Sequence, residues 1–214
     1  MDGATYCMVL RHPQSLLKGW YMDSCSEHYK SSAVLNIWFW FTLLLINFPQ
    51  LGHSQKLLLK ETSIAFVSEA PLELIKANNK SVTGVIDLEK QQLLIYVKND
   101  GFKGFNSPLQ QEHFFENYLE IHKYSKTTFS AKLIDGFDPE KNGLYQVRAK
   151  GMLDIHGQKK ERILKVQIEV KDGLITFQSN FSILLEDHDI AIPRIVYQKI
   201  AEEIQVKVTG VLEP

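Results

Sequence analysis

The sequence predicts an all-β fold, a single antiparallel β-barrel of about eight strands with one or two short helices. Apolar and polar residues alternate over most of the chain after Thr62, which is typical of antiparallel strands with one buried face. Most links between the expected strands are short enough for hairpins, and several strands exceed the usual five or six residues. A barrel leaves such long strands without a free edge. A two-sheet sandwich is the alternative, although shorter strands would suit it better.

The first half of this region contains four expected strands and two expected helices. The strands lie in SIAFVSEA (63–70), in SVTGVIDLEKQQLLIYVKND (81–100), which holds two strands joined near Glu89, and in TTFSAKLID (127–135). The first helix is expected in APLELIKANN, where Pro71 suits the first helical position and Asn78 a stop. The second is expected from Pro108 to about Ile121.

The second half alternates more regularly. In GLYQVRAKGMLDIHG (143–157) and the strand after it, one face carries Tyr145, Val147, Ala149, Leu153, Ile155, Leu164, Val166, Ile168 and Val170. Asp172-Gly173 then predicts a hairpin turn. The next strand places Ile175, Phe177, Phe181, Ile183 and Leu185 on one face, and the last strand does so with Ile204, Val206 and Val208.

An apolar run, residues 33–48, precedes the barrel region. It is shorter than the roughly 20 residues of a membrane-spanning helix. Gly52 and Ser54 follow in the spacing that signal peptidase accepts. The sequence therefore predicts a signal peptide over residues 22–54, cleaved after Ser54, and a barrel domain over residues 55–214 that does not span the membrane. A retained N-terminal anchor is the alternative.

Composition excludes some classes of function. Both cysteines, Cys7 and Cys25, precede the apolar run, so the exported chain depends on a packed core rather than on disulfides. A formal net charge of −1 and the absence of a basic stripe argue against a nucleic-acid partner. Residues 1–21 fit neither a signal peptide nor a domain and are interpreted as a mis-assigned start.

The segment LQQEHFFENYLEIHKYSKTTF (109–129) concentrates three glutamates and two histidines. On a helix, His113 and Glu116 could share a metal ion, but His122 would lie about 180° away from His113. A catalytic zinc ion needs three protein ligands. We therefore interpret the segment as an amphipathic helix with a solvated acidic face that caps or lines the barrel.

No other pattern predicts catalysis or a cofactor. The sequence has no Gly-x-Ser-x-Gly elbow, phosphate-binding loop or dinucleotide fingerprint, and residues 55–214 contain no cysteine nucleophile. The stretch Asp187-His188-Asp189 is interpreted as the polar end of a strand. We therefore expect no enzymatic activity, no metal and no cofactor.

Four segments together resemble the YceI-like family. They are SIAFVSEAPLELIKANNKSVTGVIDLE, EHFFENYLEIHKYSKTTF, YQVRAKGMLDIHGQKKE and FSILLEDHDIAIP, and the resemblance covers nearly all of residues 62–212 in order. It implies a lipocalin-like barrel, a periplasmic or secreted location and, as in some members, a polyisoprenoid chain in the lumen. It implies no catalytic residues. Ser125 stands where the family usually has Pro, and Leu184-Leu185-Glu186 where an Arg is common. His188 and Asp189 stand where an aromatic residue and a glycine are usual.

We therefore predict an exported protein that holds an apolar, polyisoprenoid-type lipid in its lumen. Two hypotheses stand beside it: a hydrolase that uses His113 and Glu116, and an envelope interaction or stress-response protein whose barrel is filled by its own side chains. An open apolar tunnel favours lipid binding, a third ligand beside His113 and Glu116 favours the enzyme, and a packed lumen with an exposed apolar patch favours the interaction protein. The expected lumen residues, chosen by alternation and aromatic size, are Phe66, Leu94, Tyr96, Phe129, Leu153, Phe177, Phe181 and Ile183, with Phe115 and Tyr118 at the entrance.

Overall fold

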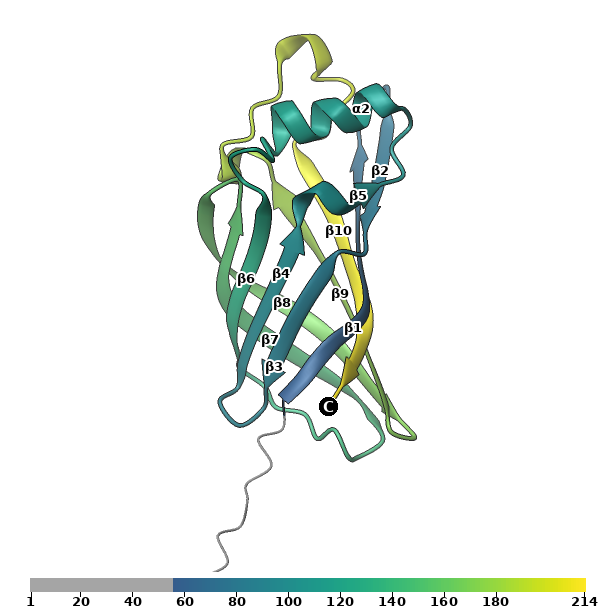
Figure 1. Ribbon diagram of the computed structural model, residues 1–214, viewed down its shortest axis with the longest axis vertical. Coiled ribbons are helices and arrows are strands. Elements are labelled where there is room, and N and C mark those ends of the chain that lie inside the picture. Colours follow the sequence, from purple (N-terminus) through teal and green to yellow (C-terminus); the bar gives the residue numbers. More distant parts are fainter. Residues whose placement is uncertain (1–55) are drawn as a thin grey trace, which may run out of the picture. The chain divides into compact units, whose positions relative to one another are not determined.

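The computed structural model describes residues 56–214, which fold into a closed antiparallel barrel (Figure 1). In ring order the eight barrel strands are β1 (Lys56–Glu69), β3 (Val82–Asp87), β4 (Gln92–Lys98), β6 (Lys126–Leu133), β7 (Gly143–Ile155), β8 (Gln158–Lys171), β9 (Leu174–Leu184) and β10 (Glu203–Glu213). Pairing of β10 with β1 closes the ring. The predicted all-β barrel is confirmed. The expected signal peptide and the first 21 residues lie outside the described residues.

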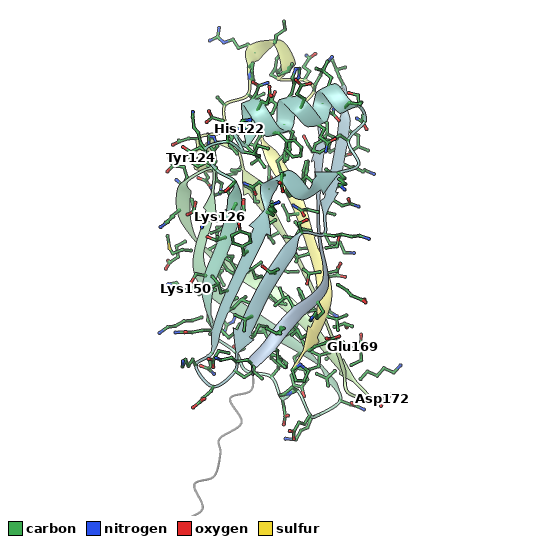
Figure 2. The ribbon with its side chains drawn as sticks, viewed as in Figure 1. His122, Tyr124, Lys126, Lys150, Glu169 and Asp172 are labelled. Carbon is green, nitrogen blue, oxygen red and sulfur yellow. The ribbon has the colours of Figure 1, made fainter. Side chains whose placement is uncertain are left out.

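The alternation read from the sequence sets the two faces of the wall. In β7, Val147 and Ala149 face inward and are almost fully buried, whereas Lys150 points away from the barrel, as does Glu169 of β8 (Figure 2). The β8–β9 hairpin turns at Asp172-Gly173, where both residues have positive φ, 50° and 83°. This geometry belongs to the two-residue hairpin turn that Asp-Gly favours, so that prediction is confirmed.

The helix predicted over residues 70–79 is wrong. Ala70 and Glu73 exchange backbone hydrogen bonds in a turn, and the chain then forms strand β2 (Leu74–Asn79). Strand β2 pairs with the second half of β1 on one side and with the short β5 (Phe102–Lys103) on the other. These ladder bonds outweigh the weak helical preference of the segment.

Strand β1 changes partner along its length. Its first residues, 56–58, pair with β3, whereas residues 64–69 pair with β2. A bulge separates the two parts, with Glu61 at φ 44°. Strands β2 and β3 therefore run one after the other beside β1, and β5 pairs with the end of β2 near the start of β3. The two ends of the barrel are thus built differently.

A short helical segment lies across the end of the barrel where β2 and β5 stand (Figure 1). It consists of α2 (Pro108–His113) and one π-helical stretch, η2 (Phe114–Tyr118). Ser107 caps α2 by accepting a hydrogen bond from the amide of Gln110, 3.2 Å away. The helix was expected to reach Ile121, but it ends earlier, because Glu120 takes a positive φ of 44°. We call residues 104–125 the cover. No helix in residues 56–214 is long and apolar enough to cross a membrane.

Three short 3-10 turns complete the chain. Asn99–Gly101 joins β4 to β5, and Glu186–His188 and Arg194–Val196 lie between β9 and β10. Strand β9 ends at Leu184, so the stretch Asp187-His188-Asp189 was wrongly interpreted as the end of a strand. It forms a turn, with Asp189 at φ 53°.

Candidate ligand-binding cavity

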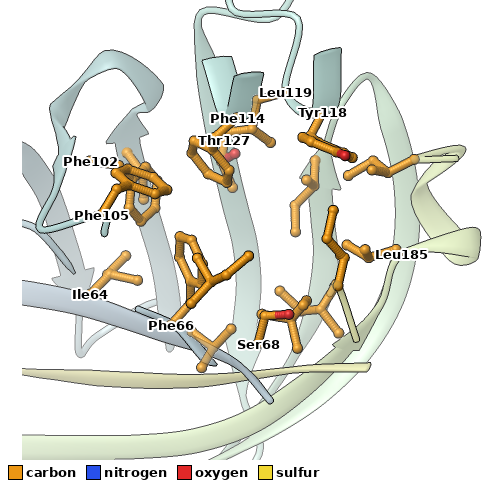
Figure 3. Close-up of a pocket in the computed structure, with 18 of the residues that line it drawn as sticks. Ile64, Phe66, Ser68, Phe102, Phe105, Phe114, Tyr118, Leu119, Thr127 and Leu185 are labelled. Carbon is orange, nitrogen blue, oxygen red and sulfur yellow. The ribbon is translucent and has the colours of Figure 1, made fainter. Parts of the chain in front are cut away.

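A cavity of about 500 Å³ occupies the half of the barrel beneath the cover, which we call the open half. Figure 3 shows side chains from several elements pointing into one space, among them Ile64 and Phe66 from β1, Tyr118 from η2, and Leu185. Six of the predicted lumen residues line this cavity: Phe66, Tyr118, Phe129, Leu153, Phe181 and Ile183. Their contact with a ligand stays a prediction.

The other four predicted lumen residues lie elsewhere. Phe177 lines a separate, deeper cavity of about 60 Å³. Phe115 packs against the core without lining the large cavity. Leu94 and Tyr96 lie on the outer face, with exposed fractions of 50% and 39%. The assignment of Leu94 and Tyr96 to the lumen is therefore wrong.

The error in β4 has a simple origin. Residues 93–97 are all apolar, and the polar residues that mark the outer face, Gln92 and Lys98, lie at the two ends of the strand. The structure places Leu93, Ile95 and Val97 inward, with Ile95 opposite the buried Phe129 of β6. Tyr96 instead packs outside, where the Nζ of Lys126 lies 5.8 Å from its ring centre. Ring size predicted the wrong face because register, not size, decides it.

Four phenylalanines form an aromatic cluster at the covered end. Phe114 of η2 lies 5.2 Å from Phe66, 5.4 Å from Phe102 and 5.0 Å from Phe105, measured between ring centres. All four line the cavity. Three of them, Phe102, Phe105 and Phe114, were missed in the sequence, because Phe102 and Phe105 lie in a segment without periodicity and Phe115 was chosen instead of Phe114. The only feature of the sequence that links two members of the cluster is that Phe105 follows Phe102 by three positions.

Acidic, basic and imidazole side chains reach the cavity only from segments at its covered end. Glu73 lies in the β1–β2 turn, His113 in α2, and Lys199 in the connection between β9 and β10. The Oε1 atom of Glu73 accepts a hydrogen bond of 2.8 Å from Nε2 of Gln110, which ties the turn to the cover. The cavity therefore has a polar rim and an apolar depth.

The hydroxyl groups of Ser68 and Thr127 in the cavity wall have protein partners. Ser68 accepts a hydrogen bond from the amide of Ala201 at 2.9 Å, and Thr127 donates to Oδ1 of the buried Asn99 at 3.0 Å. Asn99 in turn donates to the carbonyl oxygen of Tyr124 at 2.7 Å. These bonds hold the surrounding loops and leave a wall that suits an apolar ligand.

The end of the cover is joined to the barrel through His156. Its Nε2 lies 2.9 Å from Oε2 of Glu120, and its Nδ1 lies 3.0 Å from the carbonyl oxygen of His188. The Tyr124 ring packs edge-on against His156, with 4.5 Å between ring centres. Gly157 follows at φ 75°, and a Cβ there would lie 2.6 Å from the Tyr124 ring. The turn after β7 therefore needs glycine both for its backbone and for this contact.

Two pKa values near the cover are shifted. Hydrogen bonds from Lys123 and then from His156 lower the pKa of Glu120 below its usual range, so this carboxylate is charged at neutral pH. Burial raises the pKa of the Tyr118 phenol, so Tyr118 presents a neutral hydroxyl at the cavity wall. Burial accounts for the shift at Tyr118, and hydrogen-bonded partners account for the shift at Glu120.

The hydrolase hypothesis required His113, Glu116 and a further ligand to converge. His113 lines the rim, whereas Glu116 is exposed and does not line the cavity. Within residues 56–214, no three His, Cys, Asp or Glu side chains come together in an arrangement that could hold a metal ion.

Comparison with protein families identifies the fold. The model of the YceI-like domain matches residues 57–212, which is most of the chain and all but the edges of the described part. The chain belongs to the YceI-like domain family. The family resemblance and the lipocalin-like barrel predicted from the sequence are confirmed.

Solved structures agree with this fold. A polyisoprenoid binding domain from Saccharophagus degradans implicated in plant cell wall breakdown matches with a TM-score of 0.60 at 15% identity, covering 74% of this chain and 97% of that one. BcnA of Burkholderia cenocepacia matches with a TM-score of 0.58 at 15% identity, covering 72% and 96%. A YceI protein of Campylobacter jejuni matches with a TM-score of 0.51 at 22% identity, covering 64% and 84%. No curated protein matches the sequence.

Proposed function

We propose that this YceI-like protein is exported and binds an apolar lipid of the polyisoprenoid type in the open half of its barrel, without chemical conversion. One observation carries the proposal: a cavity of about 500 Å³ is apolar in its depth and receives charged side chains only at its rim. Cavities of roughly 300–1,000 Å³ are typical of small-molecule sites. Such a shape suits a molecule with one polar end and an apolar body.

Burial of the apolar body would supply the affinity. Apolar surface removed from water contributes roughly 25 cal/mol per Å² before the entropy of association is subtracted. The rim residues Glu73, His113 and Lys199 would meet the polar end. A fold relative from Saccharophagus degradans is described as a polyisoprenoid binding domain, which supports the same class of ligand here. The open cavity disfavours the hypothesis of a barrel filled throughout by its own side chains.

Native mass spectrometry, followed by lipid extraction from the same sample, tests the proposal on protein purified from its own envelope. We expect a lipid adduct in the wild type. Ile183→Trp, which fills the cavity wall, should abolish the adduct, whereas the matched variant Leu94→Trp on the outer face should retain it. Equal loss in both variants, or a wild type without lipid, would refute the proposal.

Export rests on the apolar run at residues 33–48 and on the small residues after it. We expect the exported protein to begin at Gln55, which N-terminal sequencing measures. A membrane-bound form that retains residues 33–48 would support the anchor instead.

A further inference from the structure

The large and the small cavity are stacked within one barrel and share part of their lining. Five residues line both: Ile95, Phe129, Leu164, Phe181 and Val208. They come from five different strands, β4, β6, β8, β9 and β10. Ile95 and Phe129 are direct neighbours across the β4–β6 ladder. We call these five residues the partition.

Beyond the partition the barrel is filled by its own side chains. The small cavity there measures about 60 Å³, and Val147 and Ile168 in its lining are at most 2% exposed. We call this the filled half.

Inward-facing glycines tighten the filled half. A Cβ on Gly210 would lie 2.8 Å from the Phe177 ring, and a Cβ on Gly84 would lie 2.9 Å from a methyl group of Leu59. Phe177 lies directly opposite Gly210 in the β9–β10 ladder, so its ring occupies the space that the glycine leaves on the neighbouring strand. Interdigitation of this kind gives a core at crystal-like density, which has no room for a ligand chain.

The depth of the open half follows from strand geometry. Leu185 at the covered end lies four positions after Phe181 of the partition. On β1, Ser68 likewise lies four positions after Ile64, which pairs with Val208 of the partition. At about 3.3 Å per residue, each wall is about 13 Å long. A carbon–carbon bond of about 1.5 Å advances an extended chain by about 1.3 Å, so about ten carbons span this depth.

We propose that the partition is a chain-length stop, so that the ligand is an amphiphile with its polar end at the rim and a short apolar tail, of two to three isoprene units, ending against Phe129 and Phe181. This inference rests on the proposed lipid-binding function. Carbons beyond the stop cannot enter the filled half. They stay near the cover and add little to the affinity.

Isoprenyl alcohols of increasing length test the stop: geraniol, farnesol and geranylgeraniol, with 10, 15 and 20 carbons. Their affinity for residues 55–214 is measured by displacement of a fluorescent apolar probe. Each buried methylene increases affinity by about fourfold. We expect a rise from geraniol to farnesol that ends there, with farnesol and geranylgeraniol binding within about threefold of each other.

Variants in the partition should move the stop. Phe181→Ala joins the two cavities, so geranylgeraniol should bind at least about tenfold more tightly than farnesol. Phe181→Leu and Phe129→Leu should shift the chain-length limit in the same direction by a smaller amount. They replace Phe181→Ala in the test if that variant does not fold. Phe66→Leu, in the wall of the open half, should weaken all three alcohols and keep their ranking. Circular dichroism establishes that each variant is folded.

The outcomes separate the stop from the lipid-binding function. Failure of all three alcohols to bind the wild type overturns the proposed function, and the stop with it. Binding that keeps rising to geranylgeraniol in the wild type overturns the stop alone. An unchanged limit in folded Phe181→Ala, Phe181→Leu and Phe129→Leu variants also overturns the stop.

Discussion

The imidazole of His156 lies 2.9 Å from the carboxylate of Glu120 and so joins the β7–β8 turn to the end of the cover. The same ring reaches the backbone of His188. Three segments, the end of the cover, the β7–β8 turn and the turn after β9, are therefore held by one side chain. We therefore expect loss of this link to affect the position of the cover more than the stability of the barrel.

Glu120→Gln should loosen the cover selectively. The amide keeps the shape of the side chain but replaces a charge-assisted hydrogen bond with a weaker one. We expect faster hydrogen exchange for the amides of residues 114–124 and little change in the β7–β8 ladder, measured by mass spectrometry. The control is Glu161→Gln, which breaks a solvent-exposed pair with Lys150 and should leave both regions unchanged. Equal exchange at residues 114–124 in the two variants would contradict the role of Glu120.

His188 should make stability depend on pH. The ring is fully buried, and its Nδ1 lies 3.3 Å from the carbonyl oxygen of Gln158. Its Nε2 is the one buried side-chain nitrogen or oxygen atom in residues 56–214 without a hydrogen-bond partner. Burial lowers its pKa below the ordinary value of 6.5, although backbone carbonyls and Asp187 act in the opposite direction and Lys160 assists. The unfolded state then binds the proton more readily. The contribution to stability is complete above pH 6.5 and is lost as the pH falls towards the lowered pKa.

Urea unfolding at pH 7.5 and pH 5.5 measures this effect. We expect the wild type to lose stability between the two pH values through this group, and His188→Phe to lose less. His122→Gln, at an exposed position, should retain the wild-type dependence. The same loss in wild type and His188→Phe would refute the assignment.

Gly151 and Gly173 should respond very differently to alanine. A Cβ on Gly151 would lie 2.1 Å from the carbonyl oxygen of Ser130, so the β6 and β7 backbones would have to separate. Gly173 has nothing within 4 Å, and its only constraint is φ of 83°. We expect Gly151→Ala to cost about 3 kcal/mol and Gly173→Ala about 1 kcal/mol, by chemical denaturation. Similar costs would show that β6 and β7 can move apart freely.

These features divide into those the sequence predicts and those it does not. Alternation placed Leu153, Phe181 and Ile183 on the inner face, because polar neighbours mark the outer face of β7 and β9. In β4 the error came from choosing by ring size, because Gln92 and Lys98 at the ends of the strand share the outer face with Leu94 and Tyr96, while Ile95 pairs with Phe129.

The remaining misses depend on contacts between distant segments. Residues 70–79 have helical signals, but β2 forms because β1 and β5 offer it hydrogen-bond partners. Phe102 and Phe114 meet because the cover folds back over β1, and no local pattern encodes this. His156 and Glu120 are 36 residues apart in the sequence, so no local pattern predicts that they form a contact.

Ser179→Trp distinguishes a continuous lumen from a partitioned one. Ser179 lies on the inner face of β9, lines the small cavity with Phe177 and Phe181, and donates a hydrogen bond of 2.8 Å to the carbonyl oxygen of Lys165. If the lumen were continuous, tryptophan there would obstruct the ligand and disturb the fold little. In the structure it would enter the filled half, where about 60 Å³ cannot hold an indole ring.

We therefore expect Ser179→Trp to lower the free energy of unfolding by about 3 kcal/mol through overpacking, while the folded fraction still binds ligand in the open half. Ser179→Ala isolates the lost hydrogen bond and should cost about 1 kcal/mol. Asn180→Trp places the same ring at an exposed neighbouring position and should cost little. Residues 56–214 contain no tryptophan, so the fluorescence of each introduced ring reports unfolding in denaturant directly, and lipid loading is measured on the same samples. A stable Ser179→Trp variant that has lost its ligand would mean that the lumen runs past Phe181 to the far end of the barrel.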